Sequence, residues 1–425
     1  DTPGVLADGG RLEMLAIAGV PNYDTRMGQT VGTALPVTWV PIANPNPPGT
    51  SSTAVFSQGL ALGGARVAWL EGCWYGNGAI YFDSTSVLHV LPGGSIAGVQ
   101  SSQLIFRSGS TLQAIGTATD SVTFTSAVPG SYWYGLHFQD NPTDTSRIRY
   151  GLIEDGGITG NGPLYTTNSH VLVVDSSRVR NSQYRAVYLN SAGSMLRWTT
   201  IDTTLTASPS WPAVDVNAAN VTIVRGTIRG AALVGLRVSG PGSLVEASVT
   251  PSVTGSGSYP MNIPIPAFAA LFDTRADQDS LFGNGADTIS IQGGTLVGDT
   301  ILVGSSLPWR LETTTYLTSN SRMNVEPGGT IAGTTSGWLR FQTGSTLQAI
   351  GTIALPITFT STNPTGYWYG IQFEDAPSDT SRVRLAVIEN GGVSGNGPLY
   401  ALNSHVVVLD SIHVRNSQYR AVYLA

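Results

Sequence analysis

The sequence predicts an all-β solenoid in which short strands stack as successive coils. Residues 92–189 recur as residues 327–424 with no insertion or deletion, at a constant shift of 343 − 108 = 235 positions, and such internal repetition is typical of repeat architectures. Short apolar triplets alternate with Gly, Asn, Asp, Ser and Pro, as short strands and turns do. Only 11% of the residues are charged, which argues against helices with Glu- and Lys-rich solvent faces.

Composition also excludes several classes of protein. The single Cys rules out a disulfide scaffold within one chain. The net charge of −6 with no basic run makes nucleic acid an unexpected partner. No apolar stretch approaches the roughly 18 residues that span a membrane. The chain begins at Asp1 without a leader and its second copy stops within the repeat, so we expect a removed signal or a longer parent protein.

Three segments follow in order along the chain. Residues 1–86 contain strand-like pieces at 11–18 and 79–82 around a Pro-rich loop. Residues 87–326 form the first solenoid unit, and residues 327–425 form a truncated second unit. One short helical stretch is expected, at 267–271. The expected strands of the solenoid include the apolar triplets 104–106, 122–124, 136–138, 171–173, 221–223 and 234–236.

The strands are too short for the walls of a β-sandwich, and two-residue hairpin signals are sparse. A coil of about 20–25 residues with two or three strands fits better. Stacked coils place like residues about 4.8 Å apart, which favours inward apolar columns and outward Ser, Thr and Asn columns.

Several segments resemble right-handed parallel β-helix proteins of the secreted and surface type of bacteria. The resemblance covers residues 87–425 and rests on Pro92–Ile96, Gly109–Thr117, Val122–Ser126, Trp133–Phe138, Ser146–Tyr150 and Ile153–Gly157. It implies an extracellular, cell-surface or periplasmic location. Because this scaffold carries lyases, hydrolases, adhesins and inert spacers alike, the resemblance indicates the fold and leaves the activity open.

The first 86 residues resemble a different family, the PhoX-type alkaline phosphatases. The matching segments are Leu12–Leu15, Pro21–Arg26, Leu35–Val40 and Leu70–Gly78. That family consists of exported β-propellers with iron and calcium at the active site. The resemblance implies a β-rich segment similar to part of a propeller, with Glu71 at the place of a metal-ligating carboxylate.

Paired carboxylates are the first candidates for catalysis. Asp140 and Asp144 recur as Asp375 and Asp379. Glycosidases hold two carboxyl groups about 5 Å apart or roughly 6.5–9.5 Å apart, and adjacent or alternate coils offer both spacings. The same residues are also typical of turns, where Asp and Asn bind backbone N–H groups. No cofactor is expected, with calcium kept open as a ligand of these carboxylates.

Arginines are the second candidates, because the chain has no Lys. Arg147 recurs as Arg382, and either would have to act as the base in a polysaccharide lyase. The high pKa of a guanidinium makes that role demanding, and a surface ion pair is the simpler reading. His170 and His405 are read as structural residues of a coil turn.

Aromatic side chains are the best candidates for binding. Trp133 and Tyr134 recur as Trp368 and Tyr369. Exposed rings of this kind stack on sugar faces. The alternative is that each Trp covers the apolar side of its own coil.

We therefore predict a non-enzymatic, exported or cell-surface solenoid with a structural, adhesive or glycan-binding role. Its expected partners are a polysaccharide or another surface ligand, and further copies of itself joined end to end through exposed strand edges. The reason is that the chain duplicates its most regular stretch, which suits repeated weak binding sites better than one asymmetric pocket. The alternatives are a polysaccharide lyase or glycoside hydrolase, and a fragment of a PhoX-type phosphatase.

Overall fold

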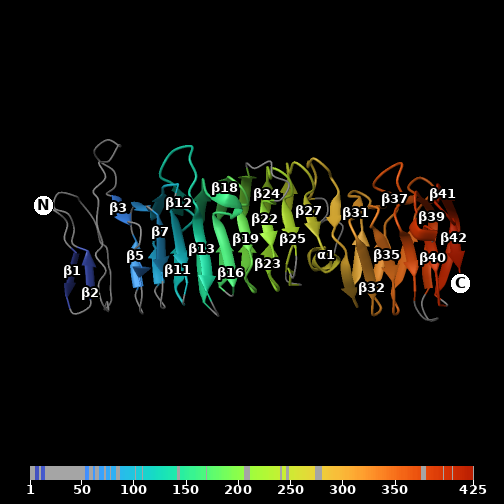
Figure 1. Ribbon diagram of the computed structural model, residues 1–425, viewed down its shortest axis with the longest axis horizontal. Coiled ribbons are helices and arrows are strands. Elements are labelled where there is room, and N and C mark those ends of the chain that lie inside the picture. Colours follow the sequence, from blue (N-terminus) through green and yellow to red (C-terminus); the bar gives the residue numbers. More distant parts are fainter. Residues whose placement is uncertain are drawn as a thin grey trace. The chain divides into compact units, whose positions relative to one another are not determined.

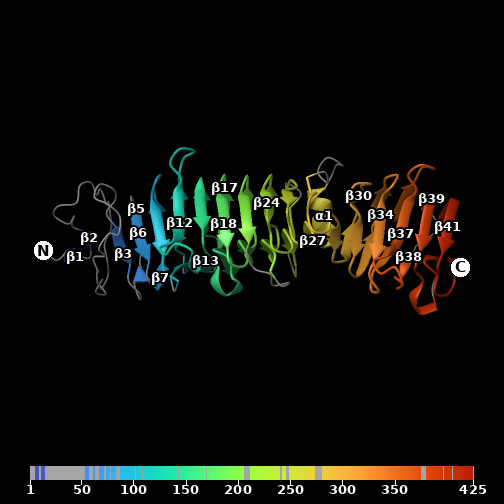
Figure 2. The same ribbon diagram turned by 90° about the horizontal axis from the view of Figure 1, so that it is seen from above.

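The chain forms a parallel β-solenoid, which confirms the predicted fold class. The computed structural model describes the backbone of 5–8, 11–14, 53–56, 61–62, 67–70 and 73–76, and then residues 78–424 except 83–86, 101, 108, 141–143, 169, 205–210, 240–241, 246–247, 273–279, 375–379, 396 and 404. Two compact units result. Unit 1 comprises residues 1–233 and 240–242, and unit 2 comprises residues 234–239 and 243–425. Within each unit the strands lie side by side in stacked rows (Figures 1 and 2).

Unit 1 repeats three strands per coil, and each strand pairs in parallel with its counterparts in the neighbouring coils. The first sheet contains β5 (Val67–Leu70), β8 (Val87–Val90), β11 (Thr111–Ile115), β14 (Thr145–Arg149), β17 (Val171–Asp175), β20 (Met195–Arg197) and β23 (Thr222–Val224). The second contains β3 (Thr53–Phe56), β6 (Cys73–Gly76), β9 (Ser95–Gly98), β12 (Val122–Ser126), β15 (Gly151–Glu154), β18 (Arg178–Ser182), β21 (Thr200–Thr204) and β24 (Thr227–Arg229). The third contains β4 (Ala61–Leu62), β7 (Ala79–Phe82), β10 (Gln103–Phe106), β13 (Gly135–Asp140), β16 (Leu164–Asn168), β19 (Val187–Leu189) and β22 (Val214–Val216).

Unit 2 has the same kind of coil. Its elements are β25 (Leu236–Val238), β26 (Ser252–Thr254), β27 (Met261–Ile263), α1 (Ile265–Leu271), β28 (Ile289–Ile291), β29 (Gly294–Val297), β30 (Thr300–Val303), β31 (Trp309–Leu311), β32 (Thr314–Thr318), β33 (Arg322–Val325), β34 (Thr330–Gly333), β35 (Trp338–Phe341), β36 (Thr346–Ile350), β37 (Ile357–Ser361), β38 (Gly370–Phe373), β39 (Thr380–Glu389), β40 (Leu399–Ala401), β41 (Val406–Arg415) and β42 (Val422–Leu424). The short helix α1 confirms the helical stretch expected at 267–271. One 3₁₀ turn follows the second sheet in each copy, Ile158–Gly160 and Val393–Gly395.

The internal repeat of the sequence is also a repeat of strands. Strands β9 to β12 return as β34 to β37 with the same lengths, shifted by 330 − 95 = 235 positions. In unit 2, β39 covers the positions of β14 and β15, and β41 covers those of β17 and the first three of β18. The two copies therefore build equivalent coils.

The coils vary more in length than the sequence predicts. Paired residues of neighbouring coils are separated by 147 − 113 = 34 positions between β11 and β14, and by 195 − 173 = 22 positions between β17 and β20. Loops between the strands absorb the difference, because the register of the ladder is set by the strands themselves.

Parallel pairing also extends to the N-terminal side of residue 87. Strand β6 pairs in parallel with β3 and β9, and β5 pairs in parallel with β8. Only β1 (Val5–Asp8) and β2 (Arg11–Met14) form an antiparallel pair among the described strands. The described strands between residues 53 and 82 thus pair as parts of the same solenoid.

Stacked rings fill the interior, as the predicted inward columns require. The ring centroids of Phe82 and Phe106 lie 4.6 Å apart, and those of Phe106 and Phe138 lie 5.2 Å apart. Unit 2 repeats this pair as Phe341 and Phe373, at 5.1 Å. All of these Phe side chains are fully buried, so each coil of the solenoid is held to the next by apolar contact.

Candidate functional site

The two candidate tryptophans belong to the core. Trp133 is 1% exposed and Trp368 is 0% exposed. Each indole Nε1 donates a hydrogen bond to a backbone carbonyl, Glu154 O at 3.0 Å and Glu389 O at 3.1 Å. A ring with no exposed face has no surface for a sugar, so the expectation that these indoles bind a glycan is wrong. Burial of the large apolar ring is the physical reason.

Their tyrosine neighbours are half-buried. Tyr134 has no ring contact of its own among the described residues. Tyr369 stacks on Trp338, with 4.7 Å between ring centroids. The other face of Trp338 carries the guanidinium of Arg340, 4.6 Å from the ring centroid. Tyr369 is therefore part of a packed stack, and glycan binding by the two tyrosines stays a prediction.

The candidate carboxylates lie largely outside the described residues. This holds for Asp375, Asp379, Glu71 and the side chain of Asp140, which ends β13. Asp144 is half-buried just before β14, and its carbonyl oxygen accepts a hydrogen bond from Val171 N at 2.9 Å. The catalytic and calcium-binding roles of these residues stay predictions.

Asp155, after β15, lies in a left-handed turn. Asp155 has a φ of 54°, and its counterpart Asn390 also has a φ of 54°. Asn and Asp are the side chains best suited to this left-handed conformation. The exchange of Asp for Asn between the copies therefore preserves the turn and dispenses with the charge.

The two histidines that occupy equivalent positions in the two copies, His170 and His405, lie inside the solenoid. His170 Nε2 is 2.8 Å from Ser146 Oγ, and His405 Nε2 is 2.9 Å from Ser381 Oγ. Their rings pack against Phe138 at 5.1 Å and Phe373 at 4.8 Å. The structural role predicted for these histidines is consistent with this burial and bonding.

Most second-sheet arginines take part in ion pairs. Arg180 Nε lies 2.5 Å from Glu154 Oε2, and Arg178 Nε lies 2.6 Å from Asp202 Oδ2. Unit 2 repeats the first pair as Arg415 and Glu389, at 2.6 Å. Exposed pairs of this kind contribute little to stability, at most about 1 kcal/mol each.

Sequence reasoning missed a stack of cationic and aromatic side chains on the third sheet. Tyr165 and Tyr188 lie 5.2 Å apart, and the guanidinium of Arg185 lies 4.3 Å from the Tyr188 ring and 4.1 Å from the Trp211 ring. Burial and the charge of Tyr188 raise the pKa of Tyr165. Each of these side chains packs against another member of the stack, so we interpret the stack as structural.

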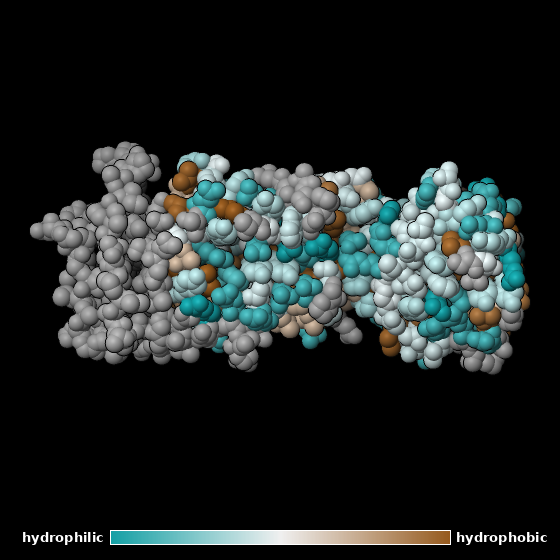
Figure 3. Space-filling model, in the orientation of Figure 1, coloured by the Kyte–Doolittle hydropathy of each residue, from teal (hydrophilic) through white to brown (hydrophobic). Residues whose placement is uncertain are grey.

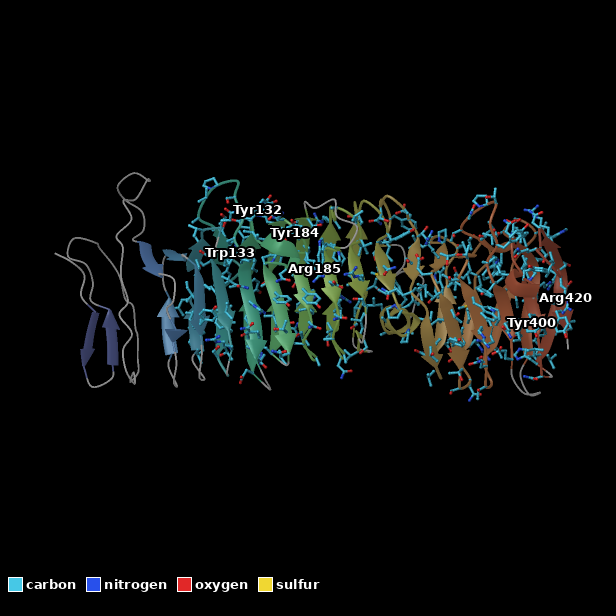
Figure 4. All side chains as sticks on the ribbon, viewed as in Figure 1. Tyr132, Trp133, Tyr184, Arg185, Tyr400 and Arg420 are labelled. Atoms are coloured by element: carbon cyan, nitrogen blue, oxygen red, sulfur yellow. The ribbon has the colours of Figure 1, made fainter. Side chains whose placement is uncertain are left out.

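The same stack recurs in unit 2. Tyr400 and Tyr423 lie 4.9 Å apart, and Arg420 lies 4.5 Å from the Tyr423 ring. Figure 4 shows Arg185 beside the strands of unit 1, and Tyr400 and Arg420 on the last coils of unit 2. The identical segments 181–189 and 416–424 were the signal that could have revealed it.

His137 on the third sheet makes stability depend on pH. Burial lowers its pKa from 6.5 to about 4, so the folded protein holds this ring neutral while the unfolded chain binds a proton below pH 6.5. Stability therefore rises with pH between 4 and 6.5, by at most about 3 kcal/mol. The counterpart in the second copy is Gln372. We expect His137→Gln to remove this contribution, measured as the difference in denaturation midpoint between pH 4 and pH 7. An equal difference in both proteins would contradict the assignment.

The outward side chains of two neighbouring first-sheet strands, β11 and β14, are identical at the equivalent positions of the second copy, in β36 and β39. We call them the duplicated face, and they are Thr111, Gln113, Ile115, Thr145, Arg147 and Arg149, with Thr346, Gln348, Ile350, Thr380, Arg382 and Arg384. Each glutamine amide donates to a threonine carbonyl at 3.0 Å, in both copies. Ile115 and Ile350 remain 38% and 43% exposed.

Part of the third sheet differs between the copies, although the stack around Tyr188 and Tyr423 recurs. Ile105 and Gln139 of unit 1 become Arg340 and Glu374 of unit 2, which form an ion pair with each other. Both sheets enclose the same kind of apolar core, and the third sheet tolerates these exchanges between the copies. The fold therefore does not require the side chains of the duplicated face to be identical in the two copies.

The fold defines the class of the protein as a parallel β-solenoid. A scan against protein-family models finds no match, and neither curated proteins nor solved structures match the chain. No helix within the described ranges is long and apolar enough to cross a membrane. In the part of the chain that the structure describes, no three His, Cys, Asp or Glu side chains are grouped to hold a metal. The face seen in Figure 3 is mainly polar, with apolar residues in separate patches.

Proposed function

We propose that the chain is a non-enzymatic, exported or cell-surface solenoid that binds a polysaccharide in a structural or adhesive role. The duplicated face is the observation that carries this proposal. It presents the same outward side chains twice in one chain, of which the isoleucine and the two arginines are exposed in each copy. A ligand that is itself a repeating polymer engages both copies at once, and linkage of two weak sites raises the overall affinity.

The chemistry of the duplicated face favours an acidic polymer. Arg147 and Arg382 are exposed, and neither has an ion-pair partner among the described residues. A guanidinium binds carboxylate and sulfate groups through two parallel N–H donors. The exposed isoleucine at the end of the neighbouring strand adds apolar surface for the sugar ring.

The experiment compares Arg147→Ala, Arg382→Ala and the double variant of the full chain in retention on polyuronate and on neutral polysaccharides. Each single variant should weaken polyuronate binding several-fold, because one site remains. The double variant should lose about 100-fold or more, because the linkage of the two sites is lost as well. Arg415→Ala is the control, since Arg415 is an exposed arginine of β41 that pairs with Glu389 and lies outside the duplicated face.

Two results would contradict the proposal. Unchanged retention of the double variant would remove the duplicated face from binding. Release of shorter products from any of the polysaccharides would show a lyase or hydrolase and overturn the non-enzymatic part.

A further inference from the structure

Trp198 is an unusual residue for its position, because both its backbone conformation and its exposure are uncommon for tryptophan. It forms the turn between β20 and β21 with a φ of 44°, a conformation in which bulky L-residues are uncommon. It is also 50% exposed, although most of a Trp side chain is usually buried. Neither the turn nor the core needs an aromatic ring at this position.

The turn of Trp198 is one of a row between the first and second sheets. Tyr150, Ser176, Trp198 and Arg225 occupy the same place in successive coils, with φ values of 49°, 49°, 44° and 47°. Backbone hydrogen bonds join the turns, from Tyr150 N to Asp175 O at 3.1 Å, from Ser176 N to Arg197 O at 2.9 Å and from Trp198 N to Val224 O at 2.9 Å. We call these four residues the unit-1 ridge.

The second copy shows that the aromatic rings are dispensable to the turn. The counterparts of Tyr150 and Ser176 are Leu385 and Ser411, with φ values of 48° and 54°. The backbone conformation is therefore kept without an aromatic ring. This contrast separates the unit-1 ridge from the duplicated face, which is the same in both copies.

Positive charge accompanies the rings. The guanidinium of Arg149 lies 5.1 Å from the Tyr150 ring centroid, and that of Arg197 lies 4.7 Å from the Trp198 ring centroid. Arg225 is exposed. Asp175 is the acidic residue beside them, and its Oδ2 accepts a hydrogen bond from Arg197 Nη2 at 2.9 Å. Three arginines against one aspartate leave a local charge of 3 − 1 = +2 on a chain whose net charge is −6.

The spacing of the rings matches an extended polymer. Successive coils are about 4.8 Å apart, so Tyr150 and Trp198, two coils apart, are separated by about 10 Å along the solenoid axis. The small side chain of Ser176 lies between them. Alternate sugars of an extended chain repeat over a similar length.

We propose that the unit-1 ridge binds an acidic polysaccharide that runs along the solenoid axis. Its sugar rings stack on Tyr150 and Trp198, and its carboxylate or sulfate groups pair with Arg149, Arg197 and Arg225. The choice of a glycan rests on the proposed function. The ring positions Tyr150 and Trp198 lie outside the duplicated face, and Arg149 is the residue that the two sites share. It also gives unit 1 a binding property that unit 2 lacks.

The test uses Trp198→Gly and Trp198→Asn in the full chain, because both residues suit a left-handed turn. We expect polyuronate binding, measured by calorimetry, to weaken at least tenfold, while the thermal midpoint stays the same or rises. Tyr150→Asn should weaken binding several-fold. Tyr419→Ala is the matched control, since Tyr419 is an aromatic residue of unit 2 with 58% exposure.

Four outcomes would overturn the inference. Polyuronate binding unchanged in Trp198→Gly would exclude the ridge. Equal affinity for a neutral polysaccharide would exclude the role of the arginines. Tighter, Trp198-dependent binding of single-stranded DNA would make the site one for nucleic acid, which also stacks on aromatic rings. Trp198 dependence that persists in the Arg147→Ala/Arg382→Ala double variant would show that the ridge binds independently of the duplicated face, whereas its loss there would refute a separate site.

Discussion

Replacement of Trp133 by Ala is expected to lower the free energy of unfolding by about 3–5 kcal/mol, the cost of removing a large ring from a packed core. The side chain is 1% exposed and its Nε1 donates to Glu154 O. A Cβ added at Gly98 would lie 2.8 Å from the Trp133 ring, so the space around the ring is already filled. Chemical denaturation followed by the loss of strand signal measures the change.

The two copies supply the controls for this prediction. Trp368→Ala should give a loss of similar size, because Trp368 has the same burial and the equivalent bond to Glu389 O. Tyr134→Ala should cost less, since Tyr134 is half-buried. A loss below about 1 kcal/mol for either Trp variant would mean that the ring is not a core element.

Replacement of Arg185 by Ala is expected to cost about 3–5 kcal/mol, since it removes one partner of a buried ion pair. Arg185 Nε lies 3.3 Å from Asp215 Oδ2, and the two side chains are only 10% and 2% exposed. The guanidinium also contacts the Tyr188 and Trp211 rings. The free energy of unfolding from urea denaturation measures the effect.

A second substitution tests the cause of that loss. Asp215→Asn in the Arg185→Ala background should recover part of the stability, because a neutral amide replaces a buried carboxylate that lost its cation. Arg178→Ala removes a surface pair with Asp202 and should cost less than about 1 kcal/mol. Equal losses for Arg185→Ala and Arg178→Ala would contradict the role of burial.

The solenoid could be predicted from the sequence because its signals repeat. The constant shift between residues 92–189 and 327–424 indicates equivalent coils. Alternation within each apolar triplet indicates which side chains of a strand face the core. Coil lengths were less predictable, since the residues between two strands do not reveal how far a loop extends. The 34-residue separation of β11 and β14 is an example.

The candidate site was harder to predict than the fold. Trp133 stands between two tyrosines at a bend, and sequence alternation does not show which of three adjacent aromatics turns inward. Its packing against Gly98, 35 positions earlier (133 − 98 = 35), depends on coil stacking. Trp198 lies outside the repeated segment, so no second copy drew attention to it. The exchange of Asp155 for Asn390 could have indicated their shared turn, because both side chains suit the same backbone conformation.

The constant shift between the copies has a genetic consequence. Removal of residues 92–326, which number 326 − 92 + 1 = 235, joins Leu91 directly to Pro327, with strands of the same kind on both sides of the junction. Each coil of a solenoid contacts only the coils next to it. In the shortened chain, the coils at the junction therefore pack against coils equivalent to their original neighbours. Unequal recombination between the two similar coding segments can thus delete or add one complete unit and leave the register of the strands unchanged. Natural variants of this protein are expected to differ in length by whole multiples of that unit.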